Sequence, residues 1–212
     1  MITGHDGEVR AVTAGIWQDR PVIISGSYDR TVRVWDLESG QPVLGPLTGH
    51  DDRVFAVAAG ERNGGPVIIS GSIDGTVRVW DLESGQPALG PLTGHNGGVN
   101  AVAVGERNGR PVIISGSSDR TVRVWDLESG QPAFAPITGH GDRVNAVTLG
   151  VWQDRPVIIS GSSDRTVRVW DLDLEGHAAM QIELQYWAQS IVYTAGRLVI
   201  GTRAELLRID LL

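Results

Sequence analysis

The sequence predicts an all-β protein built from one repeated antiparallel unit. Two dipeptides mark the repeat, and each recurs at a spacing of 45 residues. Gly-His stands at 4/5, 49/50, 94/95 and 139/140, and Trp-Asp at 35/36, 80/81, 125/126 and 170/171. The repeated segments PVIISGS and TVRVWDL are rich in β-branched residues, which favour strands. The 28 Gly against 10 Pro indicate many tight turns, and no helical periodicity appears.

Each repeat has room for four short strands separated by Gly, Ser and Asp turns. In the third repeat we expect strands at Val99 to Val104, Pro111 to Ser117, Thr121 to Asp126 and Pro132 to Thr138. Asn108-Gly109 is a typical two-residue hairpin turn between the first two of these strands.

Gly-His followed by Trp-Asp in four-strand repeats of this length resembles the WD-repeat family, whose fold is the β-propeller. The resemblance covers residues 1 to 172 as four near-perfect repeats and is of the highly repetitive bacterial kind. It implies an all-β propeller of four-stranded antiparallel blades in one domain, residues 1–212. Five blades are expected, at about 4–48, 49–93, 94–138, 139–184 and 185–212.

The fifth repeat, from about Leu184 to Leu212, is degenerate. Its three expected strands contain Ser190 to Tyr193, Leu198 to Gly201 and Leu207 to Asp210. Gln185 stands where the family has His, Ala204 stands near the turn Asp, and Ile209 replaces Trp. These departures predict strands without the polar network of the other blades.

The family resemblance implies a hydrogen-bonded tetrad of His, Ser, Asp and Trp in each regular blade, with a structural role. The four tetrads would be His5, Ser25, Asp29 and Trp35; His50, Ser70, Asp74 and Trp80; His95, Ser115, Asp119 and Trp125; and His140, Ser160, Asp164 and Trp170.

No enzyme class is favoured. Ser, His and Asp recur together, but catalysis needs one such site rather than four, and no G-x-S-x-G elbow surrounds these serines. The only region that breaks the repeat carries Glu183, Arg203, Glu205, Arg208 and Asp210 without His or a recognisable spacing. No catalytic residue is therefore assigned.

No cofactor or metal is expected either. The histidines lack the short ligand spacing of metal sites. The three DLES segments, at 36–39, 81–84 and 126–129, are interpreted as solvated turns rather than calcium-binding loops. Neither a dinucleotide fingerprint nor a P-loop is present.

Charge and composition narrow the choice of partner and compartment. The net charge is −7, and all 18 basic residues are Arg, interspersed with acidic residues, which argues against nucleic acid. Cys is absent, and no apolar stretch approaches the length of a membrane span. We therefore expect a cytoplasmic protein whose partners are other proteins.

Positions that vary between otherwise identical repeats are the candidates for partner binding. The family resemblance places three of them per blade on the partner-binding top face: the first and third residues after His and the residue before the turn Asp. They are Asp6, Glu8 and Tyr28; Asp51, Arg53 and Ile73; Asn96, Gly98 and Ser118; and Gly141, Arg143 and Ser163. Arg and aromatic side chains are common interface anchors, which favours Tyr28, Arg53 and Arg143, together with Ile73. The alternative is that these are ordinary surface positions whose residues vary without a role in binding.

Trp17 and Trp152 occur only in the first and fourth repeats, at the opposite, bottom face. They are expected either to pack locally, leaning toward the short fifth blade, or to form a second contact site. The incomplete fifth blade would expose the edge Leu206 to Asp210, which invites strand pairing. A second chain, in a homodimer, or upstream blades could supply the pairing strand equally well.

The expected function is a non-catalytic scaffold for protein–protein interaction. One alternative is a C-terminal sensor or regulatory fragment of a larger bacterial signalling NTPase or protease. Another, of a different class, is lectin-like binding of small ligands between blades.

Overall fold

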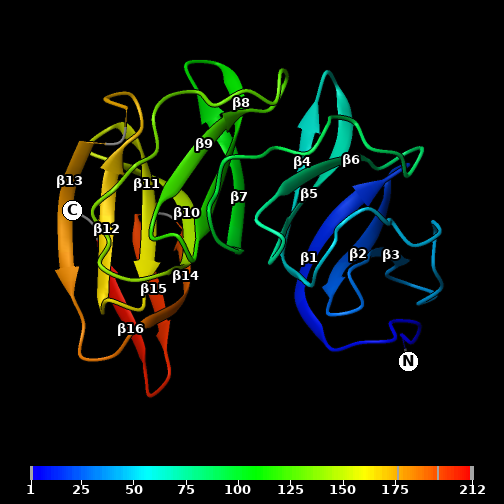
Figure 1. Ribbon diagram of the computed structural model, residues 1–212, viewed down its shortest axis with the longest axis horizontal. Helices are drawn as coiled ribbons and strands as arrows, with labels where there is room; N and C mark the ends of the chain where they lie inside the picture. Colours follow the sequence, from blue (N-terminus) through cyan, green and yellow to red (C-terminus); the bar gives the residue numbers. More distant parts are fainter. Residues whose placement is uncertain (1, 176, 195, 211–212) are drawn as a thin grey trace. The chain divides into compact units, whose positions relative to one another are not determined.

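The computed structural model describes residues 2–175, 177–194 and 196–210 (Figure 1). These residues form sixteen strands and no helix, as the sequence predicts. The strands are β1 (Val9–Trp17), β2 (Arg20–Ser27), β3 (Val32–Asp36), β4 (Val54–Arg62), β5 (Gly65–Ser72), β6 (Val77–Asp81), β7 (Val99–Arg107), β8 (Arg110–Ser117), β9 (Val122–Asp126), β10 (Val144–Trp152), β11 (Arg155–Ser162), β12 (Thr166–Asp171), β13 (His177–Glu183), β14 (Ala188–Thr194), β15 (Arg197–Thr202) and β16 (Leu206–Asp210).

The strands form five antiparallel sheets, one for each repeat, which we number blades one to five in chain order. The hairpin between β7 and β8 turns at Asn108 and Gly109, as predicted, with φ of 51° and 74°. Blade one turns instead at Gln18 and Asp19, with φ of 49° and 59°. The left-handed backbone of these turns matches the twist of the paired strands.

The outermost strand of the first three blades is reduced to two isolated bridges. In blade one, Trp35 pairs with Pro42 and Val32 with Leu47, and blades two and three repeat this pattern. From Pro42 to Leu47 the outer segment advances five positions while β3 advances three, from Trp35 to Val32. The pairing therefore shifts by two residues, and no continuous strand forms between the two bridges. The segment Pro132 to Thr138, expected as a strand, is interrupted in this way. Blade four has no proline in the corresponding segment, and there β13 is continuous.

The core lies between successive blades rather than within one sheet. Ile24 and Val34 of blade one are fully buried against Ile68 and Trp80 of blade two. The same kind of cluster joins blades three and four around Ile114 and Ile158, and another joins blades four and five. In these three pairs of blades, the β-branched residues of one repeat complete the core of the next.

Close approach of neighbouring blades explains the Gly of the SGS segment at the ends of β2, β8 and β11. A Cβ on Gly26 would come within 2.7 Å of a Val54 methyl group, and one on Gly161 within 2.6 Å of the Ala188 Cβ. No side chain fits at these positions without separating the blades.

The chain forms two compact units. The first extends to Val99 and includes Glu128–Gly130, and the second comprises Asn100–Leu127 and the chain from Gln131 onward. A single domain over residues 1–212 stays a prediction. Nowhere in the described ranges is there a helix with the length and apolar character needed to cross a membrane.

Blade five consists of β14, β15 and β16, which contain the three strands expected from the degenerate repeat. Its register shows what replaces the polar tetrad. Ile200 takes the place of the tetrad serine: it pairs with Ile191 as Ser25 pairs with Val12 in blade one. Ile209 takes the place of the tetrad tryptophan: it pairs with Leu198 as Trp35 pairs with Ile23. Apolar packing thus takes the place of the hydrogen bonds that the other blades use.

Candidate functional site

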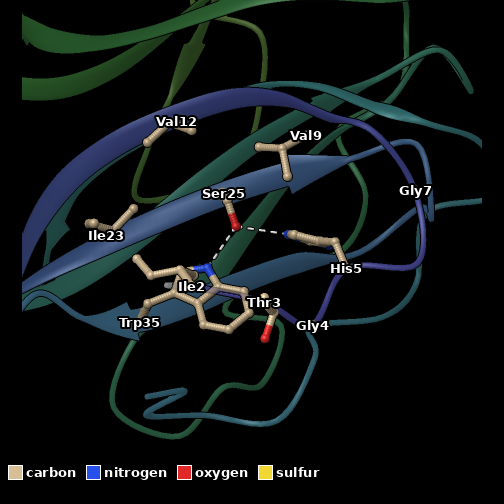
Figure 2. Close-up of a pocket in the computed structure, with 10 residues that line it drawn as sticks. All are labelled: Ile2, Thr3, Gly4, His5, Gly7, Val9, Val12, Ile23, Ser25 and Trp35. Atoms are coloured by element: carbon tan, nitrogen blue, oxygen red, sulfur yellow. Dashed lines mark hydrogen bonds between the residues drawn. The ribbon is translucent and has the colours of Figure 1, made fainter. Parts of the chain in front are cut away.

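Blade one brings its four predicted tetrad residues together. Figure 2 shows three of them, His5, Ser25 and Trp35. His5 Nδ1 lies 2.7 Å from Asp29 Oδ2, and His5 Nε2 lies 2.8 Å from Ser25 Oγ. Trp35 Nε1 donates to the same Ser25 oxygen at 2.8 Å. The group links the loop before β1 to β2, to the following turn and to β3.

Blades two and four repeat this geometry closely. The distance between His Nε2 and Ser Oγ is 2.8 Å in both, and the distance between His Nδ1 and Asp Oδ2 is 2.8 Å in blade two and 2.9 Å in blade four. In blade three, Trp125 donates to Ser115 Oγ at 2.9 Å, and Asp119 accepts from Thr121 at 2.7 Å. His95 is half-buried.

Acid–base chemistry fixes the direction of each hydrogen bond in blade four. Burial alone would raise the pKa of Asp164, but hydrogen bonds from Thr166 and His140 lower it to about 2, so the carboxylate can only accept. Burial lowers the pKa of His140, although Asp164 acts in the opposite direction. A neutral imidazole whose Nδ1–H donates to Asp164 must accept at Nε2. Ser160 therefore donates its hydroxyl hydrogen to His140 and accepts the hydrogen of Trp170.

The resulting arrangement has the connectivity of a hydrolase triad, but its serine is inaccessible. Ser70, Ser115 and Ser160 have 0% exposure, and Ser25 has 4%. Each serine oxygen also accepts a hydrogen bond from the Trp of its blade. The arrangement satisfies buried polar groups rather than activating a nucleophile.

A groove of about 510 Å³ runs beside the blade-one tetrad (Figure 2). Val9, Val12 and Ile23 line it together with His5, Ser25 and Trp35. The only polar side chains of that tetrad in its wall are His5 and Ser25, and these two bond to each other. Its chemistry is therefore mainly apolar.

The top-face residues Tyr28 and Arg53 of blades one and two form a stack with Arg10 and Phe55, in which the arginines are exposed and the aromatic rings half-buried. We call these four residues the Tyr28 cluster. The Tyr28 and Phe55 rings are stacked at 5.5 Å with an 8° angle between their planes. The Arg53 guanidinium lies 5.1 Å from the Tyr28 ring centre, and Arg10 lies 5.6 Å from that of Phe55. These contacts hold the four side chains in place while leaving both guanidinium groups at the surface.

Sequence reasoning named Tyr28 and Arg53 but missed Arg10 and Phe55. The repeat itself contains the signal that would have found them, because one position reads Arg10, Phe55, Asn100 and Asn145 in successive repeats. In blade four, Asn145 donates to Ser163 Oγ and to the Ala188 carbonyl of blade five, each at 3.0 Å. In blade three, Asn100 donates likewise to Ser118 Oγ and to the Val144 carbonyl of blade four. Asn at this position is therefore used within the fold, whereas Arg and Phe are presented outward.

The remaining top-face residues lie at the loops expected of them. The backbone N–H groups of Asp6, Asp51 and Gly141 donate to the turn Asp of their own blade. Glu8 accepts the N–H of Tyr28 through its backbone carbonyl. Ile73 lies over Gly98, Arg143 Nε donates to Ser163 Oγ at 3.3 Å, and Asn96 is exposed.

Trp17 and Trp152 do not both lean toward blade five. Trp152 packs against the cluster that joins blades four and five. Trp17 instead packs against the cluster between blades one and two, because each Trp ends the first strand of its blade and reaches the blade that follows it. Both rings are half-buried, which favours local packing over a second contact site.

No group of three or more His, Cys, Asp or Glu side chains among the described residues could hold a metal ion. The tetrad residues of blades one, two and four satisfy one another through the hydrogen bonds given above.

Comparisons with known proteins agree with this geometry. The family described as "WD domain, G-beta repeat" matches residues 1–36, 41–81, 87–126 and 133–171, which is most of the chain. The chain belongs to the WD40 repeat family. WD40 propellers generally mediate protein–protein interaction.

The solved structures support the same fold. The computationally designed protein Ika8 is similar with a TM-score of 0.77 and 29% identity. The match covers 97% of this WD40 chain and 59% of Ika8, so the chain spans less than two thirds of that relative. The predicted fold class, an all-β propeller, is confirmed. Because 1443 solved chains match, the fold alone does not specify a partner. No curated protein matches the chain.

Proposed function

We propose that this WD40 protein is a non-catalytic scaffold that binds a partner protein through the Tyr28 cluster. The tetrads hold the loops of blades one and two in a fixed arrangement, and the variable positions on those loops carry the recognition chemistry.

The observation that carries this proposal is the contrast between the Tyr28 cluster and its counterparts in other repeats. Tyr28 and Phe55 stack with Arg53 across blades one and two, whereas Ser118 and Asn100 bond to each other in blade three. Aromatic and Arg side chains supply most of the binding energy at protein interfaces. Because their conformations are already restricted by stacking, little side-chain entropy is lost when a partner binds.

A pull-down from native lysate, followed by identification of the bound proteins, tests the proposal. The Tyr28→Ala/Arg53→Ala variant should keep the wild-type circular dichroism and melting curve and lose most of its partner binding. The Trp17→Ala/Trp152→Ala variant is the control for the opposite face. Partner binding that survives the first change and is lost with the second would refute the proposal.

We also propose that the protein forms a homodimer through the edge of blade five. In the described residues β16 pairs with β15 on one side only, and Leu206 is 75% exposed. An exposed edge strand invites pairing with a second chain. Light scattering at several concentrations should show a concentration-dependent dimer; a strictly monomeric particle at all concentrations would contradict this proposal.

A further inference from the structure

A pocket of about 510 Å³ lies between blades four and five, within the second compact unit. Three loops line it. Ser163 and Arg165 come from the turn between β11 and β12, Tyr186 and Trp187 from the loop before β14, and Arg203 from the turn between β15 and β16.

The aromatic residues arise from the departure of blade five from the repeat. Two residues separate Gln185 from Ala188, whereas three separate His50 from Val54 in blade two. In place of the charged residues Asp51 to Arg53, the shorter loop carries Tyr186 and Trp187. These two side chains are 40% and 38% exposed, so the fold uses only part of their apolar surface.

The pocket is also cationic. Arg165 and Arg203 make no ion pair with any described residue, and no Asp or Glu is among the lining residues. Asp164, next to Arg165, is occupied by hydrogen bonds from His140 and Thr166. The matching turn position in blade five is Ala204, which provides no carboxylate. Two guanidinium groups thus have no direct carboxylate partner among the described residues, in a chain whose net charge is −7.

We propose that this pocket binds an extended segment of a partner protein that carries carboxylate side chains beside a large apolar residue. Each arginine presents paired N–H donors that match the two oxygens of a carboxylate. Trp187 and Tyr186 offer apolar faces against which the neighbouring side chain of the segment packs. The inference goes beyond the proposed function, because this surface shares no residue with the Tyr28 cluster and can be tested without the partner of that cluster.

Fluorescence anisotropy with a labelled peptide, Gly-Glu-Leu-Glu-Trp-Gly, tests the assignment on the full chain. The peptide should bind more weakly as salt is raised, and its glutamine counterpart should bind roughly tenfold more weakly. The double variant Arg165→Gly/Arg203→Ser should reduce affinity for the acidic peptide by a similar factor, about tenfold. Trp187→Ala should weaken both peptides.

The repeats themselves supply variants that are compatible with the fold. Gly75 occupies the Arg165 position in blade two with φ of 83°, and Ser118 occupies the Arg203 position in blade three. Arg120→Gly is the matched control, because Arg120 takes the same turn position in blade three with φ of 71°. It should leave peptide affinity unchanged, as should Tyr28→Ala/Arg53→Ala, which separates this pocket from the Tyr28 cluster.

Three results would overturn the assignment. The first is equal affinity for the acidic and glutamine peptides. The second is an Arg165→Gly/Arg203→Ser variant that melts like the wild type and binds the acidic peptide with unchanged affinity. The third is a clear preference for a phosphoserine peptide over the glutamate peptide. The last would assign the pocket to phosphate instead of carboxylate.

Discussion

Replacing His140 with alanine tests the structural role of the tetrad in blade four. The substitution removes the 2.8 Å hydrogen bond from Ser160 and the 2.9 Å hydrogen bond to Asp164. It also removes an edge-on ring contact with Trp170, whose centre lies 5.8 Å away. Asp164 keeps its bonds from Gly141 and Thr166, whereas the buried Ser160 hydroxyl loses its acceptor.

The expected cost follows from these contacts. The two lost hydrogen bonds contribute about 1 kcal/mol each, and an unsatisfied buried donor adds about 1–2 kcal/mol, so the free energy of unfolding should fall by about 3–4 kcal/mol. For a chain of this size the Tm should drop by about 6–16 °C. Thermal melting followed by circular dichroism measures the change.

His177→Ala is the matched control, because His177 is an exposed histidine on β13 outside every tetrad. Its effect on the free energy of unfolding should stay within about 0.5 kcal/mol. If His140→Ala melts at the wild-type temperature, or loses no more stability than His177→Ala, the tetrad does not stabilise blade four and the reasoning fails.

Three further outcomes are expected. Stability should decline as pH falls, because at each of these groups the unfolded chain takes up the proton first. The decline should run from about pH 7 downward for His140, whose pKa is lowered by burial, and from about pH 5 to 2 for Asp29 and Asp164, whose pKa values are about 2. A Tm that rises on acidification would contradict the assigned hydrogen bonds. Gly26→Ala should destabilise by about 1–3 kcal/mol because its Cβ meets Val54, while Gly45→Ala, with nothing within 4 Å, should be nearly neutral in the same melts. Hydrolysis of p-nitrophenyl acetate should be the same for wild type and Ser25→Ala; activity lost with the serine would make the blade-one tetrad catalytic.

The repeat made the strands and turns predictable because their determinants are local. Asn108-Gly109 specifies a hairpin by backbone conformation alone, and the β-branched run at Pro111 to Ser117 is long enough to form β8. The same local reading overestimated the outer strand at Pro132 to Thr138. The pairing with β9 shifts there by two residues, between the Trp125–Pro132 bridge and the Val122–Ile137 bridge, and this shift is a property of the pairing and not of the run itself.

Contacts between blades were harder to predict, because they join residues far apart in sequence. Trp17 was expected near blade five on symmetry grounds, yet it packs toward blade two. Phe55 was missed because its role depends on stacking with Tyr28 from the preceding blade. The pocket around Arg165 and Trp187 likewise appears only when three separate loops are brought together.

The most direct test of the account exchanges the Tyr28 cluster for residues that the protein already uses in blade three. The triple variant Tyr28→Ser, Arg53→Gly and Phe55→Asn copies Ser118, Gly98 and Asn100. Affinity for the partner recovered in the pull-down, measured by titration calorimetry, should fall at least about a hundredfold while the Tm stays within a few degrees of wild type. Unchanged affinity in this stably folded variant would contradict the claim that the variable positions of blades one and two form the binding site.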